Sequence, residues 1–325
     1  MMWKRREYMI HFNKLAIAII FALLAVPLAA RAQQEGPITT QTLVNIDSKS
    51  NTPPPQEDIS LKVGGKPASL TGWSSAAGVN GSGAAVALLI DDGLRESVGR
   101  QIGDLQSFVR NLPPGMFIYI GYMRNGTVLT QQDFTLDHAS AATKIRLPEG
   151  QPGISASPYF CLADFVQHWP SGPKARFVMM ITNGVDPYNG SDSPLNQDSP
   201  NVKTAQDAAQ RAGVAVYSIY YVDAGRGMRT EEASFSGQDY LVQVAQATGG
   251  VAYTEGNHSP MAMKPYLDRF LSAISETWVA TFPAASSGND SRLVPVKFST
   301  SEKGTKLHTA DSVLPGNQEG ALPSK

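Results

Sequence analysis

An unbroken apolar run that ends in two acids constrains the fold of this chain more than any other stretch. Residues 84–90 read AAVALLI and lead directly into Asp91, Asp92 and Gly93. A short apolar run without alternation is typical of a strand that is buried on both faces, as in a parallel sheet covered by helices. Ligands bind such sheets at the carboxyl ends of the strands. The sequence therefore predicts an α/β fold with acidic groups at its binding edge.

Alternating strand and helix patterns follow this first strand. Helices are expected over 97–112, 138–147, 159–169, 202–212, 240–247 and 260–274. Further strands are expected over 116–123, 127–134, 176–184, 214–223 and 251–253. The Asn125-Gly126 pair predicts a tight hairpin, so the strand after it should run antiparallel. This order predicts a doubly wound, mostly parallel sheet with one antiparallel edge strand.

The flanks of the α/β region divide the chain further. Residues 33–58 are polar and end in a proline-rich stretch, which predicts a linker. Residues 59–80 contain a β-hairpin around Gly64-Gly65, and the α/β domain itself is expected to span 81–276. Three alternating segments in 277–315 predict β-strands that form a small β layer with the hairpin. Residues 316–325 are expected to be a disordered tail.

The first 32 residues have the form of a secretory signal peptide. A basic start precedes an apolar stretch over 15–30, and Ala30-Arg31-Ala32 provides a small-x-small cleavage site. The alternative is an uncleaved membrane anchor, although the apolar stretch is shorter than the ~20 residues that span a bilayer. We therefore expect an exported protein, periplasmic or extracellular, with no membrane association after cleavage.

Composition limits the classes of partner and chemistry. The predicted signal peptide holds five of the 27 basic and one of the 28 acidic residues, which leaves 22 and 27 and a net charge of about −5. An acidic chain of this kind argues against a nucleic-acid partner. The single cysteine, Cys161, excludes an internal disulfide and is expected to be a small buried side chain. The five scattered histidines form no zinc pattern, and no nucleophile elbow or phosphate loop is present.

Four patterns resemble the von Willebrand factor type A domain, most closely the variant found in secreted proteins of Acidobacteria. They are LLIDDG at 88–93, RFVMMITNGVD at 176–186, LVQVAQATGGVAY at 241–253 and the closing strands at 274–298. The resemblance covers about residues 57–316. It implies a doubly wound fold and a non-enzymatic module that binds another protein. In that family, hydroxyl and carboxylate oxygens hold Mg²⁺, and an acidic side chain of the partner completes the site.

Matched position by position, the adhesion site of the family is degenerate in this chain. Asp91 matches the first aspartate, but Gly93 and Arg95 stand where two serines belong. Ser155 or Ser157 stands for the threonine, and Asn183 for the late aspartate, followed by Asp186. We therefore expect no resident cofactor, with Mg²⁺ bound at this site as the alternative, and we expect Arg95 to pair with Asp91 or Asp92 in place of the ion. The predicted binding rim consists of Asp91, Asp92, Gly93, Arg95, Ser155, Ser157, Asn183 and Asp186.

These features favour an exported, non-enzymatic module that binds another protein. One alternative is a structural component of the envelope or of a secretion system, without a working site. Another is a hydrolase in which Asp91 and Asp92 act as acid and base or hold two metal ions. Neighbouring residues of a strand point to opposite sides, which makes it difficult for both acids to face one substrate.

Overall fold

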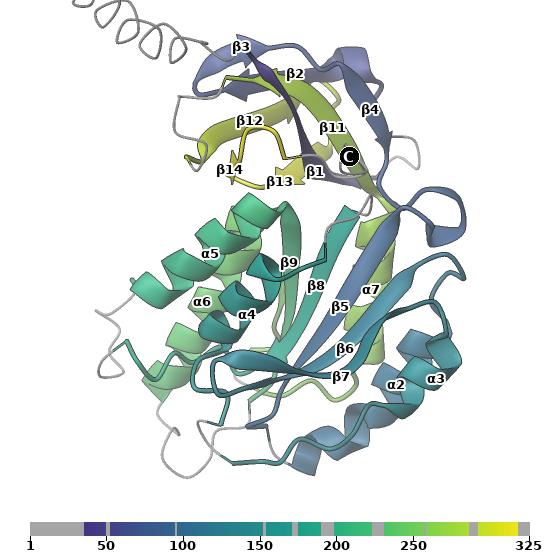
Figure 1. Ribbon diagram of the computed structural model, residues 1–325, viewed down its shortest axis with the longest axis vertical. Helices are drawn as coiled ribbons and strands as arrows, with labels where there is room; N and C mark the ends of the chain where they lie inside the picture. The colour runs from purple at the N-terminus through teal and green to yellow at the C-terminus, as the bar shows by residue number, and fades with distance from the viewer. Residues whose placement is uncertain are drawn as a thin grey trace, which may run out of the picture. The chain divides into compact units, whose positions relative to one another are not determined.

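The computed structural model (Figure 1) describes residues 36–49, 53–94, 96–151, 154–170, 175–189, 198–222, 231–256, 258–285 and 292–317. The described residues from Pro37 onward form one compact unit of the chain. The predicted signal peptide, Arg95 and the last part of the predicted disordered tail lie outside the described residues. Within the described part of the chain, no helix combines the length and the apolar character that crossing a membrane requires.

A six-stranded sheet forms the centre of the unit, with β5 (Ala84–Asp91) in its middle. Its strand order is β10-β9-β8-β5-β6-β7, and the outer members are β6 (Phe117–Arg124), β7 (Thr127–Thr135), β8 (Ala175–Thr182), β9 (Val214–Tyr220) and β10 (Ala252–Tyr253). All neighbours are parallel except β7, which pairs antiparallel with β6 at the edge. The order reverses between β5 and β8, as in doubly wound folds. The predicted fold class is confirmed.

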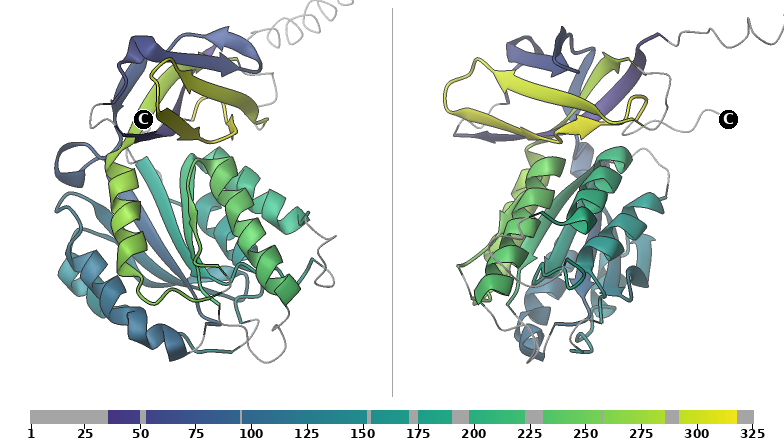
Figure 2. Two further views of the ribbon diagram at one scale, coloured as in Figure 1. Left: turned by 180° about the vertical axis from the view of Figure 1, so that it is seen from behind. Right: turned by 90° about the vertical axis from the view of Figure 1, so that its left-hand side faces the viewer.

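Both faces of β5 are covered, which explains its unbroken apolar sequence. All eight of its residues are buried. Leu88 and Ile90 join one core with α2 (Ile102–Arg110), α3 (His138–Thr143) and α7 (Lys264–Ser275). Leu89 joins the other core with α4 (Pro158–Gln167), α5 (Pro200–Ala212) and α6 (Glu231–Thr248). Alternate side chains of one strand thus enter two separate cores, and Figure 2 shows the helices on both faces of the sheet.

Three helices differ most from their predicted boundaries, and α7 also begins four residues later than expected, at Lys264. The helix expected over 97–112 is divided into a 3-10 turn, η3 (Glu96–Gln101), and α2. The helix expected over 138–147 ends at Thr143, and the chain after it is held by contacts of Arg146 described below. The helix expected over 240–247, α6, begins at Glu231. Its Gly237 allows a close approach, because an added Cβ would lie 2.3 Å from the carbonyl oxygen of Asn183.

Two four-stranded antiparallel sheets form the predicted β layer. One has the order β13-β1-β11-β4, made of β1 (Ile38–Ser48), β4 (Gly72–Ser75), β11 (Thr277–Ala284) and β13 (Thr305–Thr309). The other has the order β14-β12-β2-β3, made of β2 (Ile59–Val63), β3 (Lys66–Ala68), β12 (Val294–Thr300) and β14 (Ser312–Val313). Short 3-10 turns, η1 (Gln56–Asp58) and η2 (Val79–Gly81), precede β2 and β5. Strands from both flanks therefore share one layer, with Val44, Phe282 and Phe298 in its core.

The strand β1 corrects the linker prediction for residues 33–58. Residues 38–48 of that segment are a strand between β11 and β13. Thr40 and Thr42 are buried, so a polar sequence here is part of the packed structure. β-branched threonines fit a pleated surface well. Both partner strands come from the far end of the chain, and the local sequence therefore contains no sign of this pairing.

The β layer covers the amino-terminal edge of the central sheet. Asn45 Nδ2 of β1 donates to the carbonyl oxygen of Ala273 near the end of α7, at 2.9 Å. The amide of Asp311 donates to the carbonyl oxygen of Ala247 at the end of α6, at 3.1 Å. We call the opposite edge the rim: the segments at the carboxyl ends of β5, β6, β8, β9 and β10, with the first turns of the elements that follow them. In Figure 1 the rim lies at the bottom, away from the β layer.

Candidate functional site: the rim of the central sheet

Asp91 is the last residue of β5. Its side chain is buried and accepts several hydrogen bonds. Its side chain accepts a bond of 2.7 Å from the Thr182 hydroxyl at Oδ2, and one of 2.9 Å from the Gly93 amide at Oδ1. The Ser155 hydroxyl also hydrogen-bonds to the carboxyl. Only 3% of Asp91 is exposed. Three of the predicted rim residues, Asp91, Gly93 and Ser155, are thus brought together.

Burial raises the pKa of the Asp91 carboxyl above its usual value. Desolvation disfavours the charged form and is the largest cause. The hydrogen bonds from Thr182, Gly93 and Ser155 act in the opposite direction, because they stabilise the carboxylate, and the negative charge of Asp92 adds to the rise. The proton therefore binds Asp91 more tightly than it binds an exposed aspartate.

Thr182 is the functional neighbour of Asp91 that the sequence analysis missed. The register of β5 and β8 pairs Ile90 with Ile181, which puts Asp91 and Thr182 side by side at the next position. Asn183, predicted in this place, is one residue further on, and its Oδ1 accepts a bond of 3.0 Å from the amide of Val185. Successive side chains of a strand point to opposite faces of the sheet, so Thr182 and Asn183 could not both face Asp91. This alternation is the sequence signal that could have identified Thr182.

Ser155 and Ser157 have different roles. Ser155 faces Asp91, whereas Ser157 is the N-cap of α4 and accepts a bond of 3.3 Å from the amide of Tyr159. Ala156 between them has φ +62°, a left-handed conformation that non-glycine residues rarely adopt. This turn separates the directions of the two serines. Strain of this kind persists only where the surroundings enforce it.

Cys161 supports the same loop and is buried, as predicted. Its Sγ donates to the carbonyl oxygen of Ser155 at 3.2 Å. Desolvation, with a further contribution from the charge of Asp91, raises the pKa of its thiol to about 12. A thiol with such a pKa is a packing group and not a nucleophile at neutral pH.

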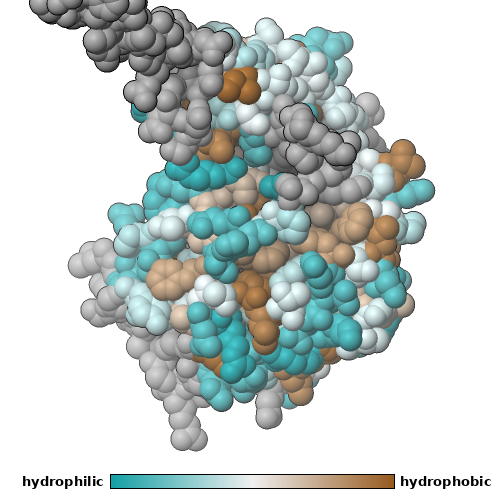
Figure 3. Space-filling view, viewed as in Figure 1, coloured by the Kyte–Doolittle hydropathy of each residue, from teal (hydrophilic) through white to brown (hydrophobic). Residues whose placement is uncertain are grey.

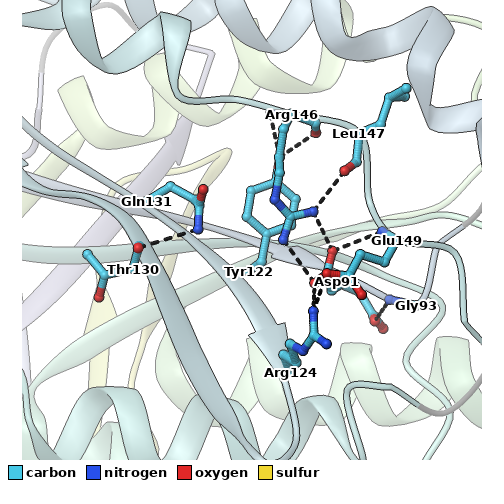
Figure 4. Close-up of polar contacts among 10 residues, drawn as sticks. Asp91, Gly93, Tyr122, Arg124, Thr130, Gln131, Arg146, Leu147 and Glu149 are labelled. Carbon is cyan, nitrogen blue, oxygen red and sulfur yellow. Dashed lines mark hydrogen bonds and ion pairs between the residues drawn. The ribbon is translucent and has the colours of Figure 1, made fainter.

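Asp92 points away from Asp91 and into a cluster of arginines. Arg146 contacts its carboxylate with both terminal nitrogens, at 2.7 and 2.9 Å, and Arg124 approaches Oδ2 at 3.5 Å. The amide of Glu149 donates to Oδ1 at 3.1 Å. Figure 4 shows Arg124, Arg146 and Glu149 converging from different segments of the chain. The cations that pair with Asp92 are thus Arg146 and Arg124; the predicted partner, Arg95, lies outside the described residues.

Arg146 is itself fixed by the ring of Tyr122. Its guanidinium carbon lies 3.9 Å from the ring centroid, and its backbone amide donates to the Tyr122 hydroxyl at 2.8 Å. The hydrogen bond with Asp92 raises the pKa of the guanidinium, and burial raises the pKa of the Tyr122 hydroxyl to about 12. Stacking and ion pairing together position the segment between α3 and α4.

Asp186 is a buried acid with a structural set of partners. It accepts hydrogen bonds from Ser199 Oγ at 2.7 Å and Asn201 Nδ2 at 2.9 Å, and one from the amide of Tyr188 at 3.2 Å. Ser199 is the N-cap of α5. Asp186 therefore joins the segment after β8 to the start of α5 and does not contribute to the group around Asp91.

The donors around Asp91 do not fit Mg²⁺. They comprise one carboxylate and two hydroxyls, and each carboxylate oxygen already accepts a hydrogen bond. Thr182 Oγ donates to Asp91 and accepts from the amide of Gly184 at 3.2 Å. Within the described ranges, no cluster of three His, Cys, Asp or Glu side chains suits a metal ion. Mg²⁺ requires octahedral oxygen ligands, so the group is better explained as a hydrogen-bonded network.

Asp91 and Asp92, the acids of the hydrolase alternative, have separate partners. Asp91 faces Thr182 in the neighbouring β8, whereas Asp92 faces Arg146 after α3. Each carboxylate is occupied by partners of its own. A single substrate would have to displace both networks to meet both acids.

Exposed large apolar side chains are concentrated on the rim. The structure describes seven of them, and four lie on the rim: Leu147, Tyr188, Phe235 and Met261. A fifth, Leu129, lies in the edge strand β7, close to the turn that follows β6. Tyr188 is 62% exposed and lies against Phe160, with ring centroids 5.4 Å apart. On the face shown in Figure 3, further apolar residues are interspersed with hydrophilic ones across the middle of the molecule. Exposed apolar side chains that lie together at one edge favour an interaction site there.

No family model and no curated protein matches this chain. Solved structures with some likeness include the conserved hypothetical protein BatB of Bacteroides thetaiotaomicron, at 16% identity and a TM-score of 0.39, covering 60% of this chain and 98% of that one. An aerotolerance-related membrane protein of Bacteroides fragilis has 13% identity and a TM-score of 0.37, with coverages of 59% and 98%. The VWA domain of SpRpn10 has 11% identity and a TM-score of 0.34, with coverages of 57% and 94%. The fold assignment rests on the strand order and register.

Proposed function

We propose that this chain is an exported, non-enzymatic module of the type A kind that binds another protein through the rim of its central sheet. The observation that carries the proposal is the placement of the exposed large apolar side chains: of the seven in the described part of the chain, four lie on the rim and a fifth lies close to it in β7. A monomer gains nothing from exposing apolar groups at one edge, whereas a partner that covers them gains burial energy.

The composition of the rim also supports a protein partner. Tyr188 and Phe160 form an aromatic pair, and the half-exposed Arg124 and Arg146 lie on the neighbouring segments. Aromatic residues and arginine are enriched at the centres of protein interfaces. The hydrogen-bonded Asp91 network would then serve as a rigid base for these side chains, and binding would need no metal ion.

The proposed export rests on the sequence. The first 32 residues have the features of a signal peptide, and the rest of the chain is acidic. The resemblance to secreted Acidobacterial domains agrees with this location. We place the protein in the periplasm or outside the cell.

Capture from envelope extracts tests the proposal. The full chain is expressed with its own leader and a carboxyl-terminal tag, and a Leu147→Ser/Tyr188→Ser variant is compared with Val79→Ser. Val79 is 79% exposed but precedes β5, at the end of the sheet opposite the rim. A protein captured by the wild type and by Val79→Ser should be lost with the double variant, and the purified pair should bind at least about tenfold more weakly, the size of an interface hot spot.

Equal capture of the same protein by all three forms would exclude the rim as the binding site. A chain that captures nothing specific in any form would instead favour the structural envelope component. Thermal unfolding of each variant checks that both substitutions leave the fold intact, as expected for exposed side chains.

A further inference from the structure

The guanidinium of Arg124 lies between two carboxylates of different kinds. One is Asp92, whose side chain is fully buried and lies 3.5 Å away. The other is Glu149, which contacts Arg124 directly and has a side chain that is 41% exposed. Arg124 is itself 32% exposed at the rim. The partly exposed Arg124 is thus paired with Glu149, which comes from a loop of the same chain.

Arg124 is not needed to neutralise Asp92. Arg146 already holds that carboxylate with two hydrogen bonds of 2.7 and 2.9 Å, a bidentate geometry that is among the strongest pairings of these groups. The two arginines and the one buried acid therefore leave one positive charge in excess. Glu149 offsets this charge in the free protein.

The side chain of Glu149 is free to leave without releasing its loop. The loop is attached through the backbone, since the amide of Glu149 donates to Asp92 Oδ1 at 3.1 Å. The amide of Gly150 donates to the Asp92 carbonyl oxygen at 3.0 Å. Exposed ion pairs contribute little to stability. A carboxylate of another protein can therefore compete with the Glu149 side chain for Arg124.

We propose that Arg124 is the receptor for a carboxylate of the partner, an Asp or Glu side chain, and that Glu149 occupies this place until the partner displaces it. The inference rests on the rim being the binding site and names the chemistry of its ligand. Apolar groups lie along the chain next to both arginines: exposed Leu147 follows Arg146, and Phe160 lies beside the turn after Arg124, where an added Cβ at Gly126 would be 3.7 Å away. The segment recognised is therefore acidic with apolar neighbours.

Fluorescence anisotropy with a labelled peptide of alternating Glu and Leu tests the inference, and a Gln/Leu peptide is the neutral probe. The full chain, processed from its own leader, is used throughout. Glu149→Gln removes the internal competitor and should tighten binding of the acidic peptide by a factor of about two to five, the range of an exposed ion pair. Glu57→Gln removes the same charge from an exposed site in η1 and should change nothing.

Adding Arg124→Gln to Glu149→Gln should abolish the gain, and Arg146 remains to hold Asp92 in that variant. A gain that persists without Arg124, or that the Gln/Leu peptide shares, would overturn the inference. So would displacement of the peptide by inorganic phosphate at an ionic strength at which acetate has no effect, because the site would then select phosphate groups. A failure here leaves the dependence of partner capture on Leu147 and Tyr188 unchanged, so the two proposals fail separately.

Discussion

The hydroxyl of Thr182 lies 2.7 Å from Oδ2 of Asp91 and donates a hydrogen bond to it, which joins the carboxyl ends of β8 and β5. Neither side chain is open to solvent. This bond lies where the resemblance to type A domains would put a metal ion. A hydrogen bond between side chains thus joins the two strand ends at that place.

Thr182→Val should lower the free energy of unfolding by about 1–3 kcal/mol, the cost of leaving a buried polar group without a partner. The change keeps the shape of the side chain but removes the donor to Asp91 and the acceptor for the Gly184 amide. Urea unfolding measures the effect. Thr127→Val in the edge strand β7 is the control, because Thr127 is exposed and should lose almost nothing. Equal losses of unfolding free energy in both variants would show that the hydrogen bond between Thr182 and Asp91 does not contribute to stability.

The stability contributed by Asp91 should fall as the pH rises. Its pKa is raised in the folded state above the value of 3.8 expected for an unfolded chain, so the folded protein binds more protons between these two values. Stability falls with rising pH wherever the folded state holds more protons. Asp91→Asn removes this titration. The variant should therefore gain stability relative to the wild type from about pH 4 upward, until the folded pKa is passed. A difference that stays constant across the pH series would contradict a raised pKa.

The central sheet was predictable because a strand that is buried on both faces has a recognisable local sequence. Strands such as 84–90 must be apolar throughout, and the sequence shows it directly. The strand β1 has no such apolar sequence. Its partners β11 and β13 come from the other end of the chain, and threonines supply part of its buried face.

The candidate site was predictable only in its strand-end residue and its neighbouring loop. Asp91 and Ser155 followed from the resemblance, but Asn183 was placed one residue away from the actual neighbour, Thr182. The arginines of Asp92 were missed because they lie 32 and 54 residues further along the chain. The Arg124 contact follows from the register of β5 and β6, which pairs Asp91 with Met123 and puts Asp92 beside Arg124. The Arg146 contact depends on how α3 packs and where it ends, which no sequence periodicity reveals.

Asp92→Asn should loosen the segment between α3 and α4. It removes the charge that holds Arg146, and hydrogen bonds to charged groups contribute about 1.5–3 kcal/mol to stability. Asp207→Asn makes the same change in an i,i+4 pair with Lys203 on a helix surface, where about 0.3–0.5 kcal/mol is expected. Urea unfolding compares the two losses. Hydrogen exchange should also accelerate at the amides of Glu149 and Gly150 in Asp92→Asn alone, and unchanged exchange there would contradict the role of Asp92.

Divalent metal should not stabilise the protein. A ligand at 100 times its dissociation constant adds ~2.7 kcal/mol to the folded state, which raises the thermal midpoint of a domain of this size by a few degrees. We expect no such rise between EDTA and millimolar Mg²⁺, because Asp91 is the one carboxylate that faces the network described around it. Gly93→Ser restores a hydroxyl of the family pattern and should still give no rise. Its Cβ would lie 3.2 Å from Asp91 Oδ1 and from the Gln151 carbonyl oxygen, so the midpoint should fall slightly.

Differential scanning fluorimetry of the wild type, Gly93→Ser and Asp91→Ala, each with EDTA and with Mg²⁺, gives the result. A rise with Mg²⁺ in the wild type that disappears in Asp91→Ala would mean that the ion displaces the hydrogen of Thr182 and rearranges the network. The carboxylate would then have exchanged two hydrogen bonds for a cation, and metal-dependent adhesion would replace the metal-free rim as the binding mode. A midpoint that is the same with EDTA and with Mg²⁺ in all three forms means that the threonine and serine hydroxyls suffice to hold the buried acid.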